Sequence, residues 1–205
     1  MKFKSTILLF LVIAFVVAVA GCSSDNNGEG VQQVKTSTEP QPSTQAQATP
    51  QEQATPVKGS LKNPAGVSDT VTVESTGNTY DFNVVKAIRG SDAEYVVKKG
   101  NEYNDKPAAG YEYLLVDAKV AYTKGENSAY IYNGNIKVFC DNVERQTAYA
   151  MLPKDYIMLE GGDVMTGGVK EGWIIYTVPQ DKEVIIGFQP NSFEGSTGYI
   201  TLGSK

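Results

Sequence analysis

The stretch that decides the fold of this chain reads YEYLLVDAKVAY and occupies residues 111–122. Its apolar residues alternate with a period of two, which is the period of a β-strand and not of a helix. The predicted core face carries Leu114, Val116, Ala118, Val120 and Tyr122. The other face is apolar at Tyr113 and Leu115 and charged at Asp117 and Lys119, so we expect it to be half exposed.

Shorter runs of the same kind fill the rest of residues 67–205. They are bounded by glycine, proline and polar turn residues and lie at 71–73, 80–88, 94–98, 136–140, 169–178, 183–189 and 199–202. About seven to nine short strands with turn signals between them are typical of an antiparallel β-sandwich. The one helical candidate is Tyr149–Leu159, which Pro153 limits to a turn or two. The sequence therefore predicts an all-β fold for this part of the chain.

Three of these segments together resemble a known family. They are GYEYLLVDAKVAY at 110–122, GGVKEGWIIYTVP at 167–179 and VIIGFQP at 184–190, and they are similar to domain of unknown function 4352. That family occurs in secreted and lipid-anchored proteins of bacteria and archaea. The resemblance implies an immunoglobulin-like β-sandwich and no catalytic residues. One departure is that Tyr122-Thr123 replace the asparagine common at the end of the long strand.

The first residues have the pattern of an export signal. A basic start at Met1–Lys4 precedes fourteen residues, 7–20, without a charge or a polar side chain. A helix of that length reaches only about 21 Å, which is short of the ~30 Å hydrocarbon core. The next residues complete Val19-Ala20-Gly21-Cys22, which resembles the lipobox of lipoproteins. We therefore expect residues 1–21 to be a lipoprotein signal peptide and Cys22 to be lipidated.

The predicted mature chain is acidic. Removal of residues 1–21 takes away Lys2 and Lys4, so 16 of the 18 basic residues remain against 23 acidic ones, a net charge of −7. This charge disfavours binding to nucleic acid, and it disfavours electrostatic attachment to anionic lipid. The membrane is therefore expected to be reached through lipid on Cys22. The predicted location is the extracytoplasmic face of the cell membrane.

Residues 22–66 have a different composition from the rest. They are rich in Ser, Thr, Gln and Pro and contain no aromatic residue, while all twelve tyrosines and the single tryptophan lie further on. Such a segment cannot bury enough apolar surface to offset the entropy of ordering it. We expect Cys22 and a disordered linker over 22–66, followed by the sandwich domain over 67–205.

Few residues are candidates for chemistry. The chain has no histidine, which excludes Ser-His-Asp and Cys-His catalysis and histidine-ligated zinc. With Cys22 lipidated, Cys140 has no disulfide partner, and its position on an apolar strand face predicts a buried structural residue. The candidate metal ligands with sulfur or oxygen atoms are the following residues: Met151, Met158, Met165, Asp92, Glu94, Glu160, Asp163, Asp181 and Glu183. Their spacing matches neither a copper site nor a calcium loop, so no catalytic, cofactor or metal residue is predicted.

Tyrosines are the remaining candidates. Tyr111 and Tyr113 share one strand face, and Tyr130 and Tyr132 share another. Tyrosine favours half-buried strand positions, but exposed tyrosines also bind sugars and protein surfaces. If a ligand surface exists, we place it at residues 128–135.

The sequence thus predicts a membrane-anchored, non-catalytic binding or structural module of the cell envelope. Its partner would be an envelope protein or polysaccharide. The alternative is an accessory lipoprotein that binds a small ligand or metal ion for a transport system. An enzyme is not expected.

Overall fold

The computed structural model describes residues 56–193 and 196–203. The signal peptide, Cys22 and the linker as far as residue 55 lie outside these residues, so the predictions for them stay predictions. No helix within the described ranges combines the length and apolar character that crossing a bilayer requires.

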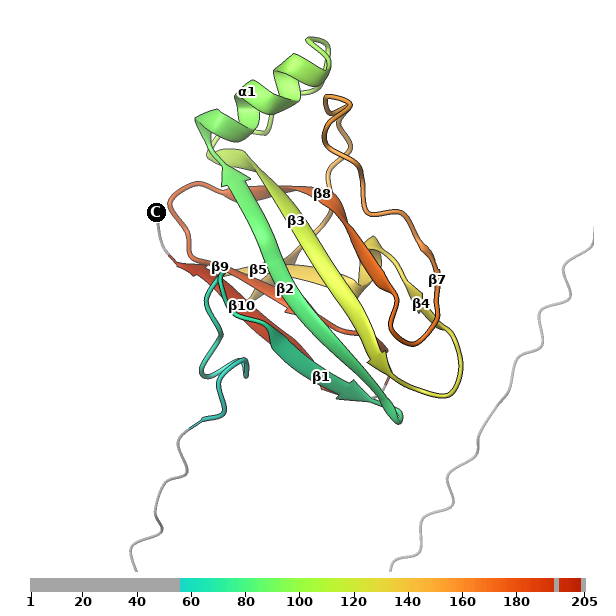
Figure 1. Cartoon of the computed structure of the whole chain (residues 1–205). Coiled ribbons are helices and arrows are strands. Elements are labelled where there is room, and N and C mark those ends of the chain that lie inside the picture. Colours follow the sequence, from blue (N-terminus) through green and yellow to red (C-terminus); the bar gives the residue numbers. More distant parts are fainter. Residues whose placement is uncertain (1–55, 194–195, 204–205) are drawn as a thin grey trace, which may run out of the picture. The chain divides into compact units, whose positions relative to one another are not determined.

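Two four-stranded antiparallel sheets face each other, one in front of the other in Figure 1. The first has the order β1 (Val71–Ser75), β2 (Asn78–Arg89), β3 (Tyr111–Lys124) and β8 (Val169–Pro179). The second has the order β10 (Gly198–Gly203), β9 (Val184–Phe188), β5 (Ile136–Cys140) and β6 (Val143–Arg145). A separate two-stranded ribbon joins β4 (Ala129–Ile131) to β7 (Gly162–Val164). The predicted all-β, immunoglobulin-like antiparallel sandwich is confirmed.

The core lies between the two sheets, where the period-two pattern placed it. All five residues on the predicted core face of β3, from Leu114 to Tyr122, are 0% exposed. The facing strands contribute Val138, Ile186, Phe188 and Ile200, each also 0% exposed. Burial of this much aliphatic and aromatic surface at about 25 cal/mol per Å² is the main term that stabilises such a domain.

The outer face of the first sheet is covered at its apolar end. Helix α1 (Ser91–Gly100) and the chain near residues 148–156 pack over it and form a second, smaller core. This core includes Tyr113, which is 4% exposed, and Leu115, which is 0% exposed. The apolar end of the outer face of β3 is therefore buried under α1, and only its charged end at Asp117 and Lys119 stays half exposed.

Two local predictions were wrong. Residues 94–98 were expected to form a strand, but they lie within α1. Ala93 and Val97, four residues apart, are the buried residues of this helix, and acidic residues in its first turn and lysines in its last complement the helix dipole. Residues 149–159 were expected to include a short helix, but they have none. Their backbone pairs with β8 instead, through the bridge between Met158 and Trp173.

Residues just before the predicted domain boundary at residue 67 contact the sandwich. Ala65 is 1% exposed and forms a parallel bridge with Ile200 of β10. Its amide donates to the carbonyl of Tyr199 at 2.9 Å, and its carbonyl accepts from the amide of Thr201 at 2.8 Å. These contacts run through the backbone, so the composition of residues 56–66 did not reveal them.

Candidate functional site

Cys140, the cysteine within the described chain, is a core residue. It is 1% exposed on β5, and its thiol is not in a disulfide. Burial raises the pKa of this thiol, and the neighbouring Arg145 guanidinium opposes that rise only in part. A protonated, buried thiol is a poor nucleophile. Cys22, the predicted lipidation site, lies outside the described residues.

The predicted oxygen and sulfur candidates are dispersed over several elements. Asp92 and Glu94 lie in the first turn of α1, whereas Asp181 lies in the turn between β8 and β9. Met158 bridges to β8 through its backbone, and Met165 lies in the turn after β7. Within residues 56–193 and 196–203, no three cysteine or carboxylate side chains come together in a way that could hold a metal ion.

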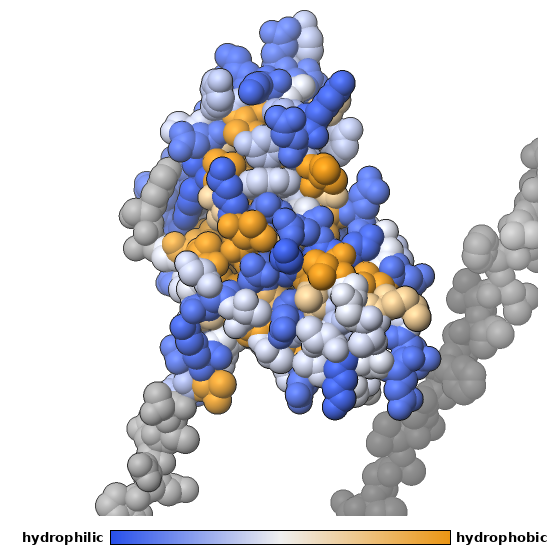
Figure 2. All heavy atoms as spheres, viewed as in Figure 1, coloured by the Kyte–Doolittle hydropathy of each residue, from blue (hydrophilic) through white to orange (hydrophobic). Residues whose placement is uncertain are grey.

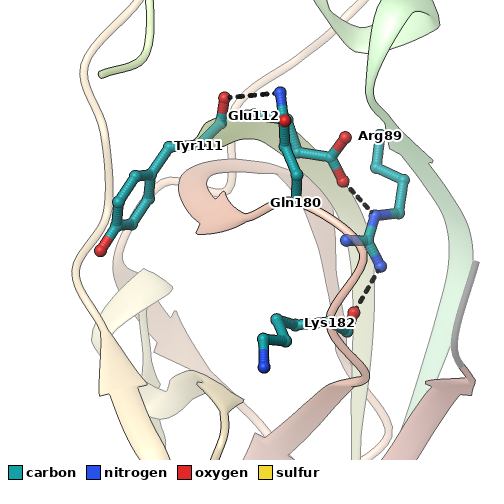
Figure 3. Close-up of polar contacts among 5 residues, drawn as sticks. All are labelled: Arg89, Tyr111, Glu112, Gln180 and Lys182. Atoms are coloured by element: carbon teal, nitrogen blue, oxygen red, sulfur yellow. Dashed lines mark hydrogen bonds and ion pairs between the residues drawn. The ribbon is translucent and has the colours of Figure 1, made fainter. Parts of the chain in front are cut away.

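A buried ion pair closes one end of the sandwich (Figure 3). Arg89 ends β2, and its Nε lies 2.5 Å from Oε1 of Glu112 near the start of β3. Their side chains are only 13% and 8% exposed. Arg89 also donates through Nη1 to the carbonyl oxygen of Lys182 at 3.0 Å. One guanidinium therefore joins β2, β3 and the turn between β8 and β9.

The same turn is held by Gln180. Its backbone amide donates to the carbonyl of Gly110 at 3.0 Å, and its side-chain amide donates to the carbonyl of Tyr111 at 3.3 Å (Figure 3). The Nη2 atom of Arg89 is buried without a hydrogen-bond partner. Because Arg89 and Glu112 neutralise each other in a buried ion pair, we infer that their role is structural and that they hold this end of the fold together.

A polar hollow of about 480 Å³ lies beside this ion pair. Its lining includes Glu94, Lys106, Tyr111, Glu112, Gln180 and Asp181. With Glu112 paired to Arg89, Glu94 and Asp181 still outnumber Lys106, so the hollow suits a neutral or cationic small molecule better than an anion. At its wall, burial and then the charges of Asp105 and Glu94 raise the pKa of the Tyr113 phenol.

A pair of exposed tyrosines lies on the β4–β7 ribbon, within the region 128–135 that the sequence favours. Tyr130 is 60% exposed and Tyr132 is 40% exposed. Their ring centroids are 5.8 Å apart and the rings are tilted by 42°. By contrast, the other predicted pair is split, since Tyr113 is buried under α1 and donates its hydroxyl to the carbonyl of Asp105. We call Tyr130 and Tyr132 the tyrosine pair.

The tyrosine pair is held on a fixed backbone. Asn135, at the end of a 3₁₀ turn (Asn133–Asn135), is 5% exposed and accepts the Tyr132 amide at 2.9 Å. Its side-chain amide donates to the carbonyl of Gln189 at 3.0 Å, which ties the turn to the end of β9. On the opposite side, a Cβ built on Gly161 would meet the Tyr130 hydroxyl at 2.6 Å. Both tyrosines therefore pack against the backbone at Gly161.

The sequence missed the buried ion pair, although it held a signal for it. Glu112 precedes Leu114 and Val116 at the two-residue spacing of one strand face, so its carboxylate lies on the core face of β3. A buried carboxylate requires a cation or several donors. That rule predicts a partner for Glu112, but it does not say which basic residue supplies it.

Comparisons with known proteins give no family. No family model matches the chain, so the resemblance to domain of unknown function 4352 stays a prediction. No curated protein matches it either.

Three solved structures are similar in part. The ycdA protein of Bacillus subtilis, described as a lipoprotein, has a TM-score of 0.49 at 13% identity over 66% of this chain, which spans only 39% of that protein. The yjhA protein of the same organism has a TM-score of 0.47 at 15% identity, over 68% of this chain and 99% of its own. The secreted protein MPT63 of Mycobacterium tuberculosis has a TM-score of 0.40 at 14% identity, over 73% and 98%.

Proposed function

We propose that the chain is a lipid-anchored, extracytoplasmic binding module of the cell envelope without catalytic activity. In this proposal residues 1–21 direct export and Cys22 carries the lipid. The following linker holds the sandwich away from the bilayer, and the sandwich binds a component of the envelope. The anchor rests on the sequence pattern, and the binding role rests on the described surface.

The observation that carries the binding role is the tyrosine pair. Two large rings stay exposed at β4, whose other side chains, Ala129 and Ile131, are buried in the core. The polar groups best suited to chemistry have structural roles instead. Arg89 and Glu112 pair with each other, and the Tyr176 hydroxyl donates to the carbonyl of Ile136 at 2.9 Å. Rigid, exposed tyrosines are a common means of binding a partner surface.

A second candidate is an accessory lipoprotein that binds a small ligand for a transport system. The polar hollow beside Arg89 and Glu112 favours it, because its volume of about 480 Å³ lies within the range of small-molecule sites. Its wide opening to solvent and its polar lining are less typical of such sites. We therefore rank this candidate second.

Co-sedimentation tests the first candidate. The full chain, solubilised in detergent, is mixed with washed envelope fragments and centrifuged. We expect it to pellet with the fragments, and we expect the double variant Tyr130→Ala/Tyr132→Ala to stay in the supernatant. The control is Tyr103→Ala, since Tyr103 is 84% exposed in the loop between α1 and β3. If the wild-type chain stays in solution, or if the double variant pellets equally, the tyrosine pair is not the binding surface.

A further inference from the structure

The tyrosine pair has surroundings that narrow the class of its ligand. Tyr130 is the cross-strand partner of Asp163, so the side chains of both lie on the outer face of the β4–β7 ribbon. Glu160 and Asp163 are both exposed in the chain leading into and through β7. The ribbon therefore places the carboxylate of Asp163 on the same face as Tyr130.

The local charge disfavours an acidic ligand. The cation known at this ribbon is Lys170, whose Nζ would lie 2.8 Å from a Cβ built on Gly162. It is opposed by the exposed carboxylates of Glu160 and Asp163, within a mature chain of net charge −7. Polyanions bind proteins through clusters of Lys and Arg, which this ribbon does not provide. The ligand expected here is therefore neutral or cationic.

The area of the tyrosine pair disfavours a protein partner. A tyrosine can bury about 150–250 Å², so two half-exposed rings offer on the order of 200 Å². A stable protein interface needs about 800 Å² on each partner. Figure 2 shows that hydrophobic residues on the face in view form separate small patches among hydrophilic ones, without one extended apolar surface. A ligand that needs only two rings fits better than a second folded protein.

Sugars meet these conditions. A pyranose ring has an apolar face formed by C–H groups, which can stack on a tyrosine ring, and an edge of hydroxyl groups, which can donate to carboxylates and phenols. Asn135 fixes the backbone of Tyr132, and the Tyr130 ring lies against Gly161, so less conformational entropy is lost at these residues when a ligand binds. A polymer also offers repeated units, which compensates for the weak binding of one unit.

We infer that the tyrosine pair binds a neutral polysaccharide by stacking sugar rings on Tyr130 and Tyr132, with Asp163 accepting hydroxyl hydrogen bonds. This inference rests on the proposed binding function and names its ligand class.

The test is sedimentation of the detergent-solubilised full chain with three insoluble neutral polymers: cellulose, chitin and mannan. We expect at least one of them to retain the wild-type chain. Tyr130→Ala and Tyr132→Ala should each weaken retention by about tenfold, whereas Tyr103→Ala should not. Gly161→Ala should also weaken it, because the new methyl group would lie 2.6 Å from the Tyr130 hydroxyl and 3.1 Å from its ring carbon Cζ, and would push the Tyr130 ring from its position. If cellulose or mannan retains the chain, periodate cleavage of the vicinal diols of its sugar rings should abolish retention by that polymer.

Several results would overturn the inference. These are retention by none of the three polymers, equal retention of the tyrosine variants, or equally strong binding to acidic polygalacturonate. A proline-rich peptide that binds through the same tyrosines, with no polymer retained, would replace the sugar by a peptide ligand. If the polymers fail while the chain still pellets with envelope fragments through the tyrosine pair, only the ligand class is wrong. If the chain binds neither the polymers nor the envelope fragments, the proposed binding function is wrong as well as the ligand class.

Discussion

At the residue scale, the Arg89–Glu112 pair shows how one buried charge constrains a fold. Glu112 faces the core, and Arg89 neutralises it while also holding the turn between β8 and β9. Loss of one partner leaves the other charge buried and uncompensated, which is far more costly than loss of a surface pair.

Glu112→Gln is expected to lower the free energy of unfolding by roughly 3 kcal/mol, because the Arg89 charge stays buried without its carboxylate. The matched control is Glu171→Gln, which breaks the pair between Lys119 and Glu171, whose side chains are 42% and 43% exposed. The control should lose less than about 1 kcal/mol. Urea unfolding measures both variants. Equal losses would mean that the buried pair does not hold the end of the sandwich.

Tyr176 predicts a loss of stability in alkali. Burial raises the pKa of its phenol above the ordinary value of 10.0. Above that pH the unfolded chain releases the proton while the folded chain keeps it, so the free energy of unfolding falls as pH rises. Tyr176→Phe should cost about 1 kcal/mol at pH 8, where it removes the bond to Ile136. It should then lose less than the wild type between pH 8 and pH 11. Urea midpoints that fall equally in both proteins would contradict this assignment.

At the scale of elements, the strands were predictable and the layer outside them was not. Alternation identified β3 and its buried face because that face is apolar without interruption from Leu114 to Tyr122. Helix α1 was missed because Tyr95, Val96 and Val97 have high strand propensity. Its acidic first turn and basic last turn were the available signals. The 149–159 segment has its position fixed by backbone contacts with β8, which no side-chain pattern records.

The tyrosine pair could be located from the sequence, since Tyr130 and Tyr132 are two residues apart in a short extended segment and therefore share one face. Its exposure could not be deduced, because Tyr111 and Tyr113 have the same spacing and Tyr113 is buried. The difference comes from α1, which covers Tyr113 and lies away from the β4–β7 ribbon (Figure 1). Tertiary contacts therefore decide which tyrosines can bind a ligand.

The contact between α1 and the 149–152 segment gives a prediction at this scale. A Cβ on Gly100 would lie 2.2 Å from the Met151 carbonyl oxygen and 2.7 Å from Leu152 backbone atoms. Although alanine favours helices more than glycine does, Gly100→Ala should therefore destabilise the protein by about 1–3 kcal/mol. Trp173 is the single tryptophan and belongs to the core under α1, so its fluorescence should change as well.

Gly66→Ala is the matched control for Gly100→Ala, because its nearest contact would be the Asp69 carboxylate at an ordinary 3.4 Å. It should leave the urea midpoint and the Trp173 emission close to those of the wild type. If Gly100→Ala is instead as stable as the wild type, the described packing of α1 on residues 151–152 is wrong.

At the scale of the whole molecule, the proposed protein consists of a lipid anchor, a linker and a binding module. In the proposed function the mature chain is acidic and cannot use charge to reach an anionic bilayer, so its membrane attachment would depend on lipid. The predicted modification at Cys22 would supply it. The sandwich would then present its tyrosine pair to the envelope.

The most direct test of this account is the mass of the N-terminal peptide of the membrane-bound protein. We predict that the peptide begins at Cys22 and carries a diacylglyceryl group, and that Cys22→Ala leaves the chain unprocessed or releases it from the membrane. Two results would contradict the account. One is a membrane-bound wild-type protein that retains residues 1–21. The other is a Cys22→Ala variant that stays at the membrane and differs in mass from the processed wild type only by the substitution.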